Sequence, residues 1–211
     1  MNPKQIGIII ITLILIITGG FYFFNKNESE NLEIYKYFKN DLAGFEFKYS
    51  ENIQLEKDLT VSVIKISSFP ETQGLLGFDQ ESLNKYKSDL EKGNLSNQSI
   101  DWGKYGKVIK LSNNIYGQEE YIFARFDICS VLFEKRLIFF KDEYIIIITL
   151  KVESELMINE NPEYFKEYYD CIGWKENSML DFYNNINNNK GVLTNQWLNN
   201  FDSIINSITF K

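Results

Sequence analysis

The chain has 211 residues, with 22 Lys and Arg against 29 Asp and Glu, no His, two Cys and three Pro, and its formal net charge is −7. Binding to a nucleic-acid backbone needs clustered cations, so an acidic chain whose only arginines are Arg125 and Arg136 argues against it. The lack of His excludes imidazole metal sites and Ser-His or Cys-His catalysis, and we predict no cofactor.

The clearest signal lies near the start of the chain, where residues 6–24 carry no charge and consist of Ile, Leu, Phe, Thr, Gly and one Tyr. As a helix with a rise of about 1.5 Å per residue, this run spans roughly 28 Å, which matches a hydrocarbon core of about 30 Å. We therefore predict a short N-terminal tail over residues 1–5, then a transmembrane helix over residues 6–24 whose partner is the lipid bilayer.

Other interpretations of this run fit less well. A cleaved signal peptide has a shorter apolar region and small residues at its cleavage site, whereas Gly20 is followed at once by bulky Phe21. A lipoprotein signal needs a Cys directly after the run, and a buried core helix seldom runs this long without a charge. We therefore expect an uncleaved signal anchor. Lys4 ahead of the run favours a cytoplasmic N-terminus and an extracytoplasmic C-terminal domain.

A polar tether, residues 25–33, follows the apolar run, and residues 34–211 then have the length of one domain. A domain of that size buries roughly 70% of its unfolded surface, so it needs no metal to hold it together. The period-two alternation of Phe45, Phe47 and Tyr49 with polar residues is typical of a half-buried strand. The strands that similar patterns predict lie at residues 45–49, 60–67, 107–111, 118–128, 131–140 and 143–152.

The last two of these strands should form an antiparallel hairpin, because the polar triplet Lys141-Asp142-Glu143 interrupts two apolar runs. Residues 144–150 are nearly all apolar, which predicts a central strand covered on both faces. Arg125 and Asp127 share one face of a strand, and Lys135 or Arg136 is expected to pair with an acid. We interpret both as ladder pairs at the surface and not as a site.

Helices are predicted on either side of these strands. Asp79 is a suitable cap for a helix that ends near Lys92 and Gly93. Pro162 favours the start of a second, with Tyr164, Phe165, Tyr168 and Tyr169 as its apolar stripe, and residues 178–183 form a short third. Thr194 is predicted to cap the last helix, whose apolar stripe is Trp197, Phe201, Ile204, Ile205 and Ile208. The fold class is therefore α+β, an antiparallel sheet flanked by helices.

Two stretches resemble those of a known family. Gly44-Phe45-Glu46-Phe47-Lys48-Tyr49-Ser50 is similar to the opening strand of PsbP-like domains, and residues 201–210 are similar to their closing helix and final short strand. Ser50 stands where the family usually has Pro, and residues 153–193 look like a helical insertion. The resemblance implies an α/β/α sandwich and a membrane-tethered accessory domain of bacterial type, with no catalytic residues common to the family.

Cys129 and Cys171 make an even count, which favours a disulfide in an extracytoplasmic domain. Such a bond would close a loop of about 43 residues and contribute roughly 4 kcal/mol in the loop-entropy model. The alternative is two buried free thiols that behave as small apolar side chains. A catalytic thiol is disfavoured, because no His is present to activate it.

Aromatic residues near glycines supply candidate contacts with a partner or ligand, namely Trp102, Tyr105 and Trp174. The alternative is that these rings are edges of the core. Glu119 and Glu120 are adjacent acids, but neighbours on a strand point to opposite faces and cannot converge on a substrate.

The sequence therefore favours a single-pass, membrane-anchored extracytoplasmic protein that is not an enzyme and that binds an envelope protein or a glycan. Two alternatives remain. A pilin-like or secretion-apparatus subunit also begins with a short basic leader and an apolar helix. A carboxylate-dependent envelope hydrolase would need two converging acids in a cleft.

Overall fold

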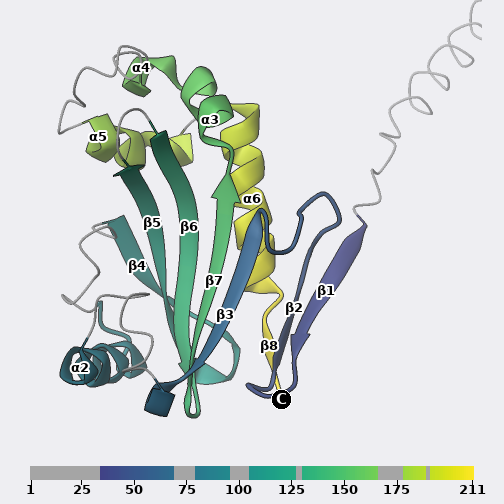
Figure 1. Ribbon diagram of the computed structural model, residues 1–211, viewed down its shortest axis with the longest axis vertical. Helices are drawn as coiled ribbons and strands as arrows, with labels where there is room; N and C mark the ends of the chain where they lie inside the picture. Colours follow the sequence, from purple (N-terminus) through teal and green to yellow (C-terminus); the bar gives the residue numbers. More distant parts are fainter. Residues whose placement is uncertain (1–33, 69–78, 96–104, 127–129, 166–177, 189–190) are drawn as a thin grey trace, which may run out of the picture. The chain divides into compact units, whose positions relative to one another are not determined.

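The computed structural model describes residues 34–68, 79–95, 105–126, 130–165, 178–188 and 191–211, and it confirms the predicted class: antiparallel sheets flanked by helices (Figure 1). The elements in chain order are β1 (Tyr35–Asn40), β2 (Phe45–Ser50), β3 (Leu59–Lys65), α2 (Gln80–Glu91), β4 (Tyr105–Lys110), β5 (Tyr116–Phe126), β6 (Ser130–Lys141), β7 (Tyr144–Val152), α3 (Ser154–Glu160), α4 (Pro162–Phe165), α5 (Ser178–Asn185), α6 (Val192–Asn206) and β8 (Thr209–Phe210).

The larger sheet has the strand order β3-β7-β6-β5-β4, and every neighbouring pair is antiparallel. The predicted hairpin of β6 and β7 is confirmed, with Lys141 paired to Tyr144 at its closed end. The prediction that residues 144–150 form a central strand is also confirmed. Strand β7 lies between β3 and β6, and its residues 145–150 are all buried.

The smaller sheet has the order β1-β2-β8. Phe45, Phe47 and Tyr49 of β2 are buried, as their alternation predicts. The ring of Phe45 packs edge-on against Phe139 of β6 with their centroids 5.8 Å apart, so the inner face of this sheet joins the core of the larger one. Strand β1 is not predicted by its sequence, because lysines and aromatic side chains occur on both of its faces.

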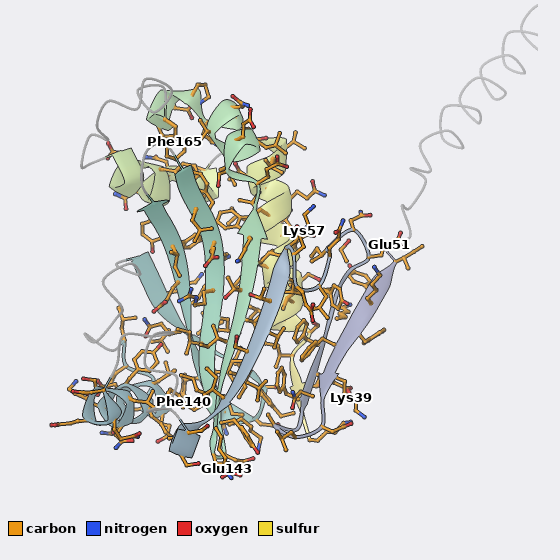
Figure 2. The ribbon with its side chains drawn as sticks, viewed as in Figure 1. Lys39, Glu51, Lys57, Phe140, Glu143 and Phe165 are labelled. Atoms are coloured by element: carbon orange, nitrogen blue, oxygen red, sulfur yellow. The ribbon has the colours of Figure 1, made fainter. Side chains whose placement is uncertain are left out.

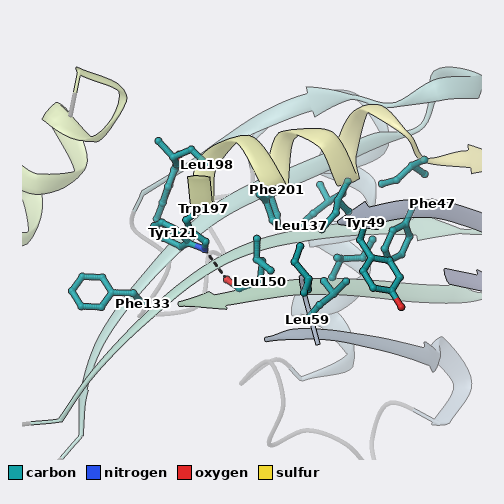
Figure 3. Packing of buried hydrophobic residues seen from close by; sticks show 14 of the residues in the cluster. Phe47, Tyr49, Leu59, Tyr121, Phe133, Leu137, Leu150, Trp197, Leu198 and Phe201 are labelled. Atoms are coloured by element: carbon teal, nitrogen blue, oxygen red, sulfur yellow. Dashed lines mark hydrogen bonds between the residues drawn. The ribbon is translucent and has the colours of Figure 1, made fainter. Parts of the chain in front are cut away.

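The two faces of the larger sheet bury different cores. One face packs against α6 and the smaller sheet, and Figure 3 shows Trp197, Leu198 and Phe201 of α6 over it. The other face packs against α2 through a cluster that comprises Leu83, Tyr86 and Leu90 of α2 and Ile64, Ile138, Phe140, Ile145 and Ile147 of the sheet.

Both ends of α2 match the prediction. Asp79 Oδ1 accepts a hydrogen bond of 2.7 Å from the backbone N–H of Ser82, which satisfies one of the free donors of the first turn. Gly93 follows the helix with φ of +74°, a left-handed conformation that glycine adopts without the strain that a Cβ brings.

The start of α6 differs from the prediction. The helix begins at Val192 after Gly191, so the expectation that Thr194 caps it is wrong. The carboxylate of Glu160, at the end of α3, takes the capping role instead. Its two oxygens accept hydrogen bonds from the N–H groups of Leu193 and Thr194 at 2.6 and 2.7 Å, and the Thr194 hydroxyl donates a third at 2.6 Å. The capping residue is therefore more than thirty positions away in sequence.

The segment between β7 and α6 contains more helix than its sequence predicts. Helix α3 was not expected, and α5 continues to Asn185 and into a 3-10 turn at 186–188 where the Asn-rich run favours a loop. The burial of Phe182 and Ile186 in the core explains this extension. Helix α4 begins at Pro162 as predicted, whereas Tyr168 and Tyr169 lie outside the described residues.

Across the residues that the structure describes, no helix is both long enough and apolar enough to cross a membrane. The span predicted at residues 6–24 and the tether at residues 25–33 lie outside those residues.

Candidate functional site

The residues singled out from the sequence fall mostly outside the described part of the chain. This holds for Cys129 and Cys171, and for Trp102 and Trp174. Tyr105 is the first residue of β4, but its side chain is not among those described. The disulfide and the aromatic contacts therefore stay predictions, and the candidate site is built from other residues.

A cleft of about 190 Å³ opens where the end of β7, the first half of α6 and the connection between β2 and β3 meet. Figure 2 labels Glu51 and Lys57 of that connection. The residues that line the cleft are Asn52, Ile53, Asp58, Leu150, Lys151, Val152, Glu153, Leu193, Gln196, Trp197 and Asn200.

The floor of the cleft is held in place by Trp197. Its indole N–H donates a hydrogen bond of 3.2 Å to the carbonyl oxygen of Leu150, drawn as the dashed line in Figure 3. Its ring also packs edge-on against Tyr121, with their centroids 6.0 Å apart. Because the tryptophan is 3% exposed, it supports the floor from below and offers a ligand almost no ring surface.

The connection between β2 and β3 forms one wall and is held by hydrogen bonds within itself and to β7. The carboxylate of Asp58 accepts a hydrogen bond of 2.9 Å from the N–H of Gln54, and the Asp58 carbonyl accepts one of 2.7 Å from the N–H of Lys151. Glu56 has φ of +72°, a conformation that costs an L-residue energy and persists only where its surroundings fix it. This wall is therefore shaped before any ligand arrives.

The rim of the cleft is polar and carries both signs of charge. The amides of Asn52, Gln196 and Asn200 each supply donors and acceptors, while Asp58 and Glu153 are acidic and Lys151 is basic. This combination suits a ligand whose groups both donate and accept hydrogen bonds. Among the described residues, no group of three acids or cysteines is placed to hold a metal ion.

A second polar cluster is buried on the α6 side of the larger sheet, around Lys135. Its ammonium group lies 3.0 Å from Asp202 Oδ1 of α6 and 3.2 Å from Glu119 Oε1 of β5. The prediction that Lys135 pairs with an acid at the surface is half right, because the pair exists but the lysine is only 2% exposed. We interpret this cluster as structural, since it joins α6 to the sheet.

A third cluster lies on the opposite face, where Glu120 is 1% exposed. Its Oε1 accepts a hydrogen bond of 2.5 Å from the side-chain amide of Gln118. Burial raises the pKa of Glu120 to about 7, although the charge of Arg136 and the Gln118 hydrogen bond both act to lower it. Glu119 and Glu120 thus face opposite sides of β5, as expected from strand geometry.

Sequence reasoning did not find the buried positions of these charges. The available signal was the run of polar residues Gln118, Glu119 and Glu120 on one apolar strand and Lys135 and Arg136 on the next. Glu120 pairs directly with Arg136, and an acid opposite a base on two apolar strands indicates a buried pair. The cleft had no such signal, because its walls come from three distant parts of the chain.

Comparison of the sequence with models of known protein families and with curated proteins finds no match. The resemblance to PsbP-like domains therefore stays a prediction that rests on the two stretches quoted above.

Proposed function

We propose that this protein is a membrane-anchored extracytoplasmic binding domain, without catalysis, that takes one unit of a glycan in the cleft beside Trp197. The observation that carries the proposal is the cleft itself, with three amide side chains on its rim and an apolar floor. The anchor and the outward orientation rest on the charge-free run at residues 6–24 and on Lys4 ahead of it.

The chemistry of the rim favours a hydroxyl-rich ligand. Each sugar hydroxyl donates and accepts a hydrogen bond, and so does each amide of Asn52, Gln196 and Asn200. A volume of about 190 Å³ is below the roughly 300–1,000 Å³ of pockets that enclose whole drug-sized ligands. The cleft therefore fits one unit of a longer chain, with its remainder in solvent.

The test is a glycan array probed with the full-length protein in lipid nanodiscs, followed by calorimetric titration of any glycan that binds. Asn200→Ala is expected to weaken binding by roughly tenfold, the effect of losing about 1.4 kcal/mol of hydrogen bonding. Asn199→Ala is the matched control, because Asn199 is exposed on the same helix and does not line the cleft. Equal binding by both variants would refute the assignment of the site.

A second candidate, a carboxylate-dependent hydrolase, is favoured by one observation: Asp58 and Glu153 both line the cleft. The same glycans decide between the two functions. Release of shorter products by the wild type, abolished by Asp58→Asn or Glu153→Gln, would establish hydrolysis. Binding without product would support the non-catalytic proposal.

A further inference from the structure

The buried residue Glu120 lies beside the edge strand β4. In the sheet, Glu120 of β5 pairs with Gly106 of β4 on one side and with Arg136 of β6 on the other. A Cβ placed on Gly106 would lie 3.4 Å from Glu120 Cγ, so the backbone of β4 packs onto this side chain. Strand β4 is the last in the strand order, and within the described residues it pairs with β5 alone.

Four described elements pack around Glu120, and each contributes the following group. Strand β5 contributes the Gln118 amide, and α2 contributes the phenol of Tyr86, whose pKa is raised by burial and by the charge of Glu120. Strand β6 contributes Arg136, which also lies 3.3 Å from Glu134. Strand β4 presents Gly106, which has no charge.

This environment solvates the ionised carboxylate incompletely. Among the described residues, Glu120 Oε2 and Arg136 Nε are buried atoms without a hydrogen-bond partner. A buried acceptor without a donor is costly, and the cost is larger when the acceptor is charged. A proton taken up from solvent by Oε2 removes the charge and makes that oxygen a hydrogen-bond donor.

We propose that Glu120 makes the docking of β4 on the larger sheet proton-dependent, with the protonated carboxyl holding the strand and the carboxylate loosening it. The chain has no His, the residue that usually titrates in the physiological range. Glu120 is the group that titrates near neutral pH instead, because burial raises its pKa to about 7. A folded-state pKa above the unfolded value gives stability that is fully present below about pH 4.5 and is lost as the pH rises through 7.

The experiment follows hydrogen exchange of the β4 amides in the full-length protein in detergent micelles, corrected for intrinsic rates, at pH 5.5, 7.0 and 8.5. With a pKa of 4.5 in the open state and about 7 in the closed one, the opening constant of β4 is expected to rise roughly thirtyfold from pH 5.5 to 8.5. Glu120→Gln is expected to abolish this rise, because its amide stays neutral at every pH.

Glu119→Gln is the matched control, since Glu119 is the adjacent buried acid on the other face of β5 and contacts Lys135 instead. This control should keep the pH dependence whatever its overall stability. A flat wild-type profile, or a rise that persists in Glu120→Gln, would overturn the proposal. If Glu120→Gln does not fold, carbon-detected NMR of the wild-type carboxyl groups replaces it. A Glu side chain that titrates between pH 6 and 8 then supports the proposal, and its absence refutes it.

Discussion

The ammonium group of Lys135 lies 3.0 Å from Asp202 Oδ1, and this contact ties the middle of the larger sheet to α6. The same nitrogen stands 5.2 Å from the centre of the Tyr121 ring and 4.9 Å from that of Phe201. Glu119 Oε1 is 3.2 Å away, so the cation has two acidic and two aromatic neighbours. The lysine therefore acts as a clamp between two layers of the fold.

Removing Lys135 should lower the free energy of unfolding far more than removing the charge of Asp202. Lys135→Ala leaves Glu119, whose side chain is 4% exposed, with only the more distant Lys107 at 3.7 Å, and we expect a loss of about 3 kcal/mol in the free energy of unfolding. Asp202→Asn should cost less than about 1 kcal/mol, because the Asp202 side chain is 55% exposed and screened by water. Urea denaturation of the two variants measures the difference.

A double variant separates charge burial from simple loss of packing. Lys135→Met combined with Glu119→Leu removes both buried charges and keeps the volume of the side chains. Apolar replacements of a buried ion pair are often neutral or stabilising, so we expect this variant to recover most of the stability that Lys135→Ala loses. A double variant as unstable as the single one would show that the ion pair itself is required.

The cap that Glu160 places on α6 predicts a loss of stability in acid. Burial alone would raise the pKa of Glu160, but hydrogen bonds from Thr194, Leu193 and Val192 outweigh it and lower the pKa. A lowered folded-state pKa gives stability that is present above the unfolded value of about 4.5 and is lost as the pH falls through the folded value. Glu160→Ala should cost about 1 kcal/mol at pH 7 and much less at pH 3.

The control for this prediction is Glu155→Ala, since Glu155 is exposed on the same helix. Its free energy of unfolding should fall by no more than about 0.3 kcal/mol, because this exposed acid interacts only with the helix dipole. A Glu160→Ala variant whose loss is the same at pH 3 and pH 7 would show that the cap does not depend on the carboxylate charge.

Local sequence patterns predict elements whose partners are near or whose pattern is simple. Asp79 and Gly93 bound α2 because a cap and a left-handed glycine act within one turn of the helix. The apolar run after Glu143 predicts a central strand, because a strand with apolar side chains on both faces is stable only where both faces are covered. These parts of the fold follow from residues a few positions apart.

Other features depend on contacts between distant residues, which a single sequence does not encode locally. Thr194 has the chemistry of a cap, yet the helix begins earlier, and Glu160 of another helix accepts hydrogen bonds from the N–H groups of its first turn. Glu120 and Lys135 are an acid and a base on neighbouring strands, and their burial depends on which helix covers each face. The cleft is hidden for the same reason, since Asn52, Lys151 and Asn200 meet only in the folded chain.

Two glycines with positive φ show how much the close contact between Gly93, which follows α2, and the Tyr116 ring contributes to stability. Gly93 and Gly44 have φ of +74° and +62°, so alanine at either position is strained by about 1 kcal/mol. A Cβ at Gly93 would also lie 3.2 Å from the ring of Tyr116, whereas at Gly44 its nearest contact is 3.5 Å away. Gly93→Ala should therefore lower the thermal midpoint more than Gly44→Ala does. Equal losses would mean that the Tyr116 ring moves aside freely.

The two cysteines give the last prediction, which tests the compartment of the domain. An extracytoplasmic location favours a bond between Cys129 and Cys171, and such a bond would close a loop of about 43 residues. We expect both thiols of the unfolded, unreduced protein to resist alkylation, and both to react once reductant is added. Mass spectrometry counts the added groups. Cys171→Ser is the control, since its single remaining thiol should react without reductant. Two reactive thiols in the unreduced wild type would contradict both the bond and the outward orientation inferred from Lys4.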